Sequence, residues 1–128
     1  MRNTLIGKLK IEPIGSISDQ TSTEESFQNR TLRPILKFQN DLLIESFKNY
    51  ISTHKNIFYS YSVEKKLAFI ENVFQRDSQY RNIAKGMVIG LFTIEEYKVY
   101  LNNSSNLNKR MMTMLIERLK SHLLLFVK

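Results

Sequence analysis

The chain has 128 residues, so one domain is expected, and its 42% hydrophobic and 24% charged residues are ordinary for a globular protein. The absence of cysteine excludes disulfides, thiolate metal sites and a cysteine nucleophile. No apolar run forms a secretory signal or reaches the ~18 residues of a membrane span, so we expect a cytoplasmic protein without membrane attachment. The formal net charge of +7 favours a polyanionic partner, chiefly RNA or DNA.

Residues 1–25 differ in composition from the rest of the chain. Their second half is rich in serine, threonine and glycine and has few bulky side chains to offset the entropy of ordering. Pro13 and Gly15 also disfavour a helix there. We predict a flexible or extended N-terminal arm over residues 1–25 and a single helical domain over residues 26–128.

The first predicted helix begins near Thr31, and we expect Thr31 or a neighbour to cap it. Pro34 suits the first turn of a helix, because its missing N–H has no partner to lose there. Apolar residues then follow at helical spacing until the segment 53–56 ends the helix. The residues predicted to face the core are Ile35, Leu36, Leu42, Leu43, Phe47, Tyr50 and Ile51.

The next three predicted helices each follow a residue whose side-chain oxygen favours a helix start. Thr93 and Glu96 have the spacing of a capping box, the clearest helix start in the chain. The expected caps and helices are Ser62 before 63–75, Asp77 or Ser78 before 78–92, and Thr93 before 95–101. Their predicted inward residues include Val63, Leu67, Ile70, Phe74, Tyr80, Ile83, Ala84, Met87, Val88 and Leu91.

The last and longest predicted helix runs to about Val127, with Ser104 or Ser105 as its cap. Five such helices, short turns between them and no convincing alternating strand predict an all-α fold, a small bundle of about five helices. The expected core stripe of the last helix begins at Leu107 or Asn108 and continues with Met111, Met112, Leu115, Leu119, Leu123 and Phe126.

Residues for catalysis or metal binding are sparse. His54 and His122 lie far apart, and neither belongs to a zinc-binding pattern. The four glycines form no phosphate-binding loop, and no nucleophile elbow is present. Glu95 and Glu96 are adjacent on a helix, so their side chains diverge by about 100° and do not form a carboxylate pair. We expect no enzyme activity, cofactor, metal or small-molecule substrate.

Three groups of basic residues are the candidate phosphate contacts. Cations at the start of the first helix oppose its dipole, which indicates either a partner anion or a tolerated exposed position. Asparagine and serine at the start of the last helix either assist a phosphate at the free N–H groups or simply cap the helix. The candidate RNA- or phosphate-binding residues are Arg30, Arg33 and Lys37 in the first group, Arg76, Arg81 and Lys85 in the second, and Lys109 and Arg110 in the third, with Asn106 and Asn108 beside them.

Methionine and tyrosine at helical spacing support an alternative function. In one interpretation, Met111, Met112 and Met114 fill the core adaptably, and Tyr97 and Tyr100 lie at the boundary of the core. The same residues would form a partner-binding surface in a protein-interaction adaptor.

Three segments of the chain, spanning roughly residues 26–124, resemble a family of short Bacteroidota helical proteins whose members often carry the label "glyoxalase". The segments are SFQNRTLRPILKFQNDLLIESFKNYI, EKKLAFIENVFQRDSQYRNIAKGMVIGLFTIEEYKVYLNNSSNLNKRMM and IERLKSHL. Metal-dependent glyoxalases have a βαβββ fold with histidine and glutamate ligands. The predicted helices and two isolated histidines do not match that fold, so a glyoxalase-like lyase stays a third alternative.

The resemblance and the composition together imply a lineage-specific ribosomal protein. A small, basic, cysteine-free chain with an extended arm is what such a component looks like, with rRNA and ribosomal proteins as partners. Arg2, Lys8 and Lys10 of the arm would then contact phosphates as the arm orders on RNA. The favoured function is a non-catalytic protein that binds structured RNA.

Overall fold

The computed structural model describes residues 23–54 and 57–127, which form helices joined by short turns with no strand among them. This confirms the predicted all-α fold. No helix in the described ranges is long and apolar enough to cross a membrane. The elements are α2 (Thr23–Phe27), the π-helix η1 (Gln28–Leu32), α3 (Arg33–Phe38), α4 (Asn40–Thr53), the 3-10 helix η2 (Ile57–Ser60), α5 (Val63–Arg76), α6 (Ser78–Ile89), α7 (Ile94–Asn102), α8 (Ser104–Ser121) and the 3-10 helix η3 (Leu123–Leu125).

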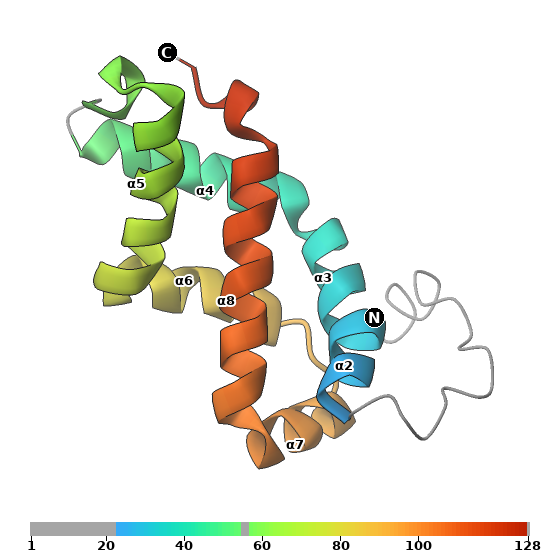
Figure 1. Cartoon of the computed structure of the whole chain (residues 1–128). Helices are drawn as coiled ribbons and strands as arrows, with labels where there is room; N and C mark the ends of the chain where they lie inside the picture. Colours follow the sequence, from blue (N-terminus) through green and yellow to red (C-terminus); the bar gives the residue numbers. More distant parts are fainter. Residues whose placement is uncertain (1–22, 55–56, 128) are drawn as a thin grey trace.

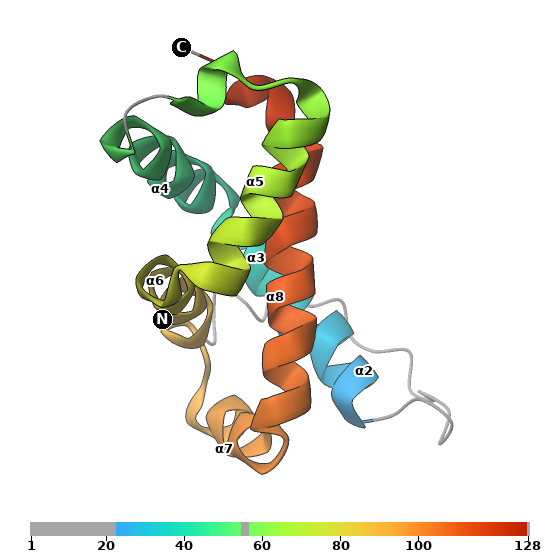
Figure 2. The same ribbon diagram turned by 60° about the vertical axis from the view of Figure 1, so that its left-hand side comes forward.

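Helix α8 runs through the middle of the molecule and contacts most of the other helices (Figure 1). Helix α5 lies beside it, while α4 and α6 cross behind it in that view (Figure 1). Figure 2 shows α2 on one flank of α8 and α7 at the N-terminal end of α8. Because α8 lies between other helices, its residues reach two flanks of the molecule.

The helical domain begins upstream of the predicted start. Helix α2 begins at Thr23, so the last three residues of the predicted arm are helical, and residues 1–22 lie outside the described residues. The predicted cap is wrong: Thr31 is buried inside continuous helical turns, and no neighbouring side chain caps η1 or α3. In an α-helix the ring of Pro34 would clash with the carbonyl four residues earlier, and the wider π-turns of η1 relieve that clash.

The first predicted helix is divided at Gln39 into α3 and α4. Gln39 leaves the helical conformation with φ −92° and ψ 7°, and its Nε2 donates a hydrogen bond to the Met87 carbonyl of α6 at 3.0 Å. The break turns α4 relative to α3, so the apolar stripe does not continue across it. Leu42, predicted to be buried, is therefore exposed.

Most of the predicted caps are confirmed. Ser62 accepts a hydrogen bond from the Lys65 N–H, Asp77 accepts one from Tyr80, and Thr93 begins a complete capping box. The prediction for α8 is wrong, because its N-cap is Asn103 and Ser104 and Ser105 lie inside the helix. The side chain of Asn103 instead donates to the Val99 carbonyl near the end of α7, at 3.3 Å.

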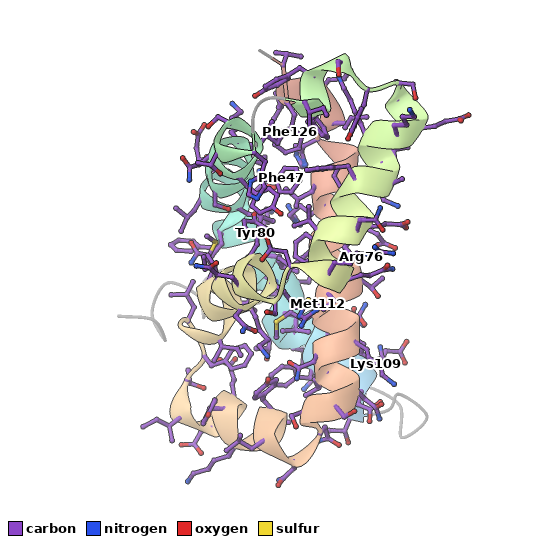
Figure 3. All side chains as sticks on the ribbon, turned by 90° about the vertical axis from the view of Figure 1, so that its left-hand side faces the viewer. Phe47, Arg76, Tyr80, Lys109, Met112 and Phe126 are labelled. Carbon is purple, nitrogen blue, oxygen red and sulfur yellow. The ribbon has the colours of Figure 1, made fainter. Side chains whose placement is uncertain are left out.

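The core contains an aromatic cluster around Phe47 (Figure 3). Phe47 contacts Tyr80 and Phe126 with ring centroids 5.7 and 5.2 Å apart, so rings from α4, α6 and the C-terminal segment meet. Helix α8 ends at Ser121, before the predicted Val127, yet Phe126 is fully buried as predicted. The predictions that Val63 and Ile83 are buried are wrong, since both side chains are exposed, Val63 at the start of α5 and Ile83 in the middle of α6.

Candidate nucleic-acid interface

A shallow groove of about 430 Å³ lies between α6 and α8. Arg81 and Lys85 are one turn apart on α6, and Asn108 and Lys109 are adjacent on α8. Met112 lies on the flank of α8 that faces α6 (Figure 3). The residues that line the groove are Arg81, Lys85, Asn108, Lys109, Met112 and Thr113.

The buried stripes of the two helices place these residues together. On α6, Tyr80 and Ala84 are buried, so the next residues along the chain, Arg81 and Lys85, lie at the edge of the packed face. On α8, Met111 belongs to a buried stripe, so the residues next to it in the chain likewise lie at the edge of the packed face. Side chains from two helices that are far apart in the sequence therefore share one groove.

The groove has three cationic side chains and, among the described residues, no Asp or Glu in its lining. Arg81 and Lys85 are half-buried, and Lys109 is exposed at the rim. Like charges in a concave surface raise the local potential and attract anions. Four of the ten residues predicted to bind phosphate thus lie together: these three cations and Asn108.

Arg81 also has a structural role that the sequence did not indicate. Its Nη1 donates to the carbonyls of Phe74 and Gln75 in the last turn of α5, at 2.9 and 3.3 Å. A cation at a helix C-terminus is favourable, and these bonds fix the guanidinium beside the groove. These bonds therefore hold the charge of Arg81 in place. Replacing Arg81 would also disturb the junction of α5 and α6.

Asn108 is held by a hydrogen bond from α7. The hydroxyl of Tyr100 donates to Asn108 Oδ1 at 2.7 Å, and Tyr100 is buried. With Oδ1 engaged, the amide nitrogen Nδ2 is the group that Asn108 offers to the groove. The buried ring of Tyr100 also excludes it from the partner-facing surface that an adaptor would need.

Two other predicted contacts, Asn106 and Arg110, turn away from the groove. Asn106 Nδ2 donates to Glu24 Oε2 at 3.2 Å, and Arg110 Nη1 donates to Gln28 Oε1 at 2.7 Å. Both bonds join the start of α8 to the segment of α2 and η1. The first turn of α8 is therefore beside a carboxylate, which opposes an additional phosphate there.

Arg30, Arg33 and Lys37 belong to a separate basic surface formed by η1 and α3. Arg33 is exposed and donates to Asn29 Oδ1 at 3.2 Å, while Arg30 has a buried Nε without a hydrogen-bond partner. Burial, and then the nearby charge of Arg33, lower the pKa of Arg118 on α8. Lys37 is exposed on α3, and the tenth predicted residue, Arg76, is exposed at the end of α5 outside the lining of the groove.

A cluster of polar side chains joins α4 to α6, and the sequence did not indicate it. Tyr50 donates to Asp77 Oδ2 at 2.8 Å, and the hydroxyls of Ser46 and Tyr80 lie 2.8 Å apart. Burial raises the pKa of Tyr80 to about 12, and burial together with Asp77 raises the pKa of Tyr50. Each of these groups is used in a contact between helices.

Both histidines end helices. His54 follows α4 and its Nδ1 lies 2.7 Å from the Tyr50 carbonyl, and His122 follows α8 with Nδ1 2.8 Å from the Arg118 carbonyl. Within the described ranges, no group of three or more His, Cys, Asp or Glu residues is arranged to hold a metal ion.

Comparison with known proteins gives no relative from which a function can be transferred. The chain matches no protein-family model, no curated protein and no solved structure. The chemistry of the groove therefore rests on its own residues, which are three cations, an amide, a thioether and a hydroxyl.

Proposed function

We propose that this chain is a non-catalytic protein that binds structured RNA as a component of the ribosome. The observation that carries the proposal is the convergence of Arg81, Lys85 and Lys109 on one groove whose described lining has no carboxylate. Cations spaced along a groove bind successive phosphates and release the counterions condensed on them. The net charge of +7 and the second basic surface on η1 and α3 support the same function.

The groove forms only in the folded chain, because Lys85 and Lys109 come from different helices. Binding through them therefore differs from the attraction that any basic chain has for RNA. Arg30, Arg33 and Lys37 belong to other elements, η1 and α3, and would contact a second part of the RNA. This arrangement favours a folded RNA over a single extended strand.

A salt titration with charge-matched variants tests the proposal. The affinity for a ribosomal RNA fragment is measured from about 50 to 200 mM salt by fluorescence anisotropy, for wild type and for the double variant Lys85→Gln/Lys109→Gln. The control is Lys48→Gln/Lys98→Gln, which removes the same charge from exposed or half-exposed positions outside the groove. Arg81 is left unchanged because of its bonds to α5.

We expect the groove variant to weaken binding at least about tenfold at the lowest salt concentration. It should also reduce the salt slope by about two, one for each phosphate that its lysines no longer neutralise. The control should change both quantities much less. Undetectable binding by wild type at the lowest salt concentration, or equal effects in the two variants, would contradict the proposal.

The ribosomal assignment needs its own experiment. The protein is purified from native lysate with and without ribonuclease, and its co-sedimentation with ribosomal subunits is measured. Co-sedimentation that ribonuclease abolishes is the expected result, and sedimentation as a free protein would exclude the ribosome. Turnover of a hemithioacetal that persists in a His54/His122 double variant would contradict the non-catalytic part of the proposal.

A protein-binding adaptor is the second candidate, favoured by an apolar stripe on α7. Ile94, Tyr97 and Leu101 lie on one face of that helix and are 73%, 43% and 54% exposed. The buried Met111 and Tyr100 do not belong to this surface, so the adaptor face differs from the one predicted. This candidate predicts that the chain captures a partner protein from lysate. The capture should persist after ribonuclease treatment and in the groove variant, and it should be lost in Tyr97→Asp/Leu101→Asp.

A further inference from the structure

The α6–α8 groove has a floor and a rim of different chemistry. On α8, Asn108 and Met112 are one turn apart and half-buried, while Lys109 and Thr113 are one turn apart and exposed. Helical geometry therefore gives α8 an inner row with an amide and a thioether, and an outer row with a cation and a hydroxyl. Arg81 and Lys85 form the opposite side.

We infer that this groove holds one unpaired nucleotide of the bound RNA, an inference that rests on the proposed function. The cations would contact the phosphates on either side of the nucleotide, and the base would lie on the thioether of Met112. The volume of about 430 Å³ is within the range of about 300–1,000 Å³ of small-molecule sites. Unpaired bases in loops and bulges are the part of an RNA that enters such a site, because base edges in a paired helix are poorly accessible.

The orientation of Asn108 adds a preference for the edge of the base. Its Oδ1 is engaged by the Tyr100 hydroxyl, so the side chain offers N–H donors to the groove. A hydrogen-bond acceptor on the base, such as a carbonyl oxygen of uracil, satisfies these donors. Tyr100 is then a positioning residue, since it fixes the amide without entering the groove lining.

The test compares two hairpin RNAs that differ by one nucleotide. One hairpin carries a single bulged uridine in its stem, and the other is fully paired and otherwise identical. Binding of the full chain to each is measured at the same salt concentration by fluorescence anisotropy. We expect the bulged hairpin to bind about fivefold or more tightly, which is the gain expected from one hydrogen bond between Asn108 and the base.

Variants separate the base contact from the phosphate contacts. Met112→Ala and Tyr100→Phe should bring the ratio of the two affinities towards one while leaving the affinity for the paired hairpin nearly unchanged. Lys85→Gln/Lys109→Gln should weaken both RNAs to a similar extent. The matched control is Met114→Ala, since Met114 is also half-buried on α8 but does not line the groove. Far-UV circular dichroism establishes that each variant is folded.

Two results overturn the inference without touching the proposed function. One is equal affinity of wild type for the two hairpins, and the other is a bulge preference that Met112→Ala and Tyr100→Phe both retain. If Met112→Ala does not fold, Asn108→Ala at a half-exposed position takes its place. Failure of wild type to bind either hairpin contradicts the proposed function itself.

Discussion

The carboxylate of Asp77 joins two helices at the point where α5 ends. Its Oδ1 accepts a hydrogen bond from the Tyr80 N–H at 3.1 Å and thereby caps α6, while Oδ2 accepts from Tyr50 of α4. The bond from the Tyr80 backbone, and then that from Tyr50, lower the pKa of Asp77 below its ordinary value of 3.8. The ionised form is therefore the one that holds the junction.

Acid should weaken this junction. Because the pKa of Asp77 is lower in the folded chain, its stabilisation is fully present above pH 3.8 and decreases as the pH falls through the folded value. Asp77→Asn keeps a capping side chain but removes the charge, so we expect it to be less stable at pH ~7 by at most about 1 kcal/mol, since solvent screens the site. Urea unfolding at pH values of about 7, 5 and 3 measures the difference in unfolding free energy between wild type and Asp77→Asn. This difference should decrease only at the lowest pH, and a constant difference would refute this account.

Thr31 and Glu96 form a buried contact between η1 and the start of α7. Thr31 Oγ1 donates to Glu96 Oε2 at 3.1 Å, while Glu96 Oε1 accepts from the Thr93 N–H in the capping box. The capping carboxylate therefore also binds a segment 65 residues earlier in the chain. One side chain serves a local and a long-range purpose.

Removing that hydroxyl should be costly. Thr31→Val is expected to destabilise the fold by about 1.5–3 kcal/mol, the range for a hydrogen bond to a charged group. Thr53→Val is the control, because exposed Thr53 donates to a carbonyl of its own helix at 3.0 Å and a destabilisation below about 0.5 kcal/mol is expected there. Chemical denaturation measures both, and equal effects would show that the Thr31 hydrogen bond contributes little.

At the scale of the element, the two glycines of the α6 segment have different surroundings. Gly86 lies inside α6, and Gly90 follows one turn later at its end. A Cβ at Gly86 would have nothing within 4 Å, so no described helix approaches there. Gly90 is the C-cap of α6, and a Cβ there would lie 2.9 Å from the Gly86 carbonyl oxygen.

Alanine at the two positions should have opposite effects. Gly86→Ala removes backbone freedom from the unfolded chain at an open helical position, so we expect a stabilisation of about 0.5–1 kcal/mol. Gly90→Ala forces the backbone at the end of α6 to shift and should be destabilising. The two melting temperatures, compared with wild type, should move in opposite directions, and a stabilising Gly90→Ala would contradict the described helix end.

At the scale of the whole molecule, the C-terminal segment closes the aromatic core. Phe126 is fully buried, and its ring meets those of Phe47 and Phe58 with centroids 5.2 and 6.4 Å apart. The 3-10 turns of η3 bring the chain back onto the bundle after α8 ends. The segment therefore contributes to the core although it lies outside a long helix.

Truncation of this ring should destabilise the entire fold. Phe126→Ala is expected to cost about 3–5 kcal/mol, the range for removing a buried phenylalanine side chain. Leu124→Ala, two residues away and 89% exposed, should cost less than about 0.5 kcal/mol. Equilibrium unfolding in urea tests the pair, and a small effect of Phe126→Ala would mean that the segment is not docked in solution.

The local features of the fold were predictable from the sequence. Caps such as Ser62 and the pair Thr93 and Glu96 depend on residues three positions apart, and amphipathic stripes depend on residues one turn apart. Their physical cause lies within one helical turn, so it can be recognised without knowing where the helix packs. The all-α class follows from the same signals.

Tertiary structure decided how the helices are divided and which basic residues meet. The break at Gln39 depends on its bond to the Met87 carbonyl, 48 residues away, and no local pattern contains that partner. Lys109 and Arg110 are adjacent and were both predicted to bind phosphate, but successive helical residues point about 100° apart and α8 lies between two groups of helices. Lys109 therefore lines the groove while Arg110 bonds to η1, because only packing determines what each face of a helix meets.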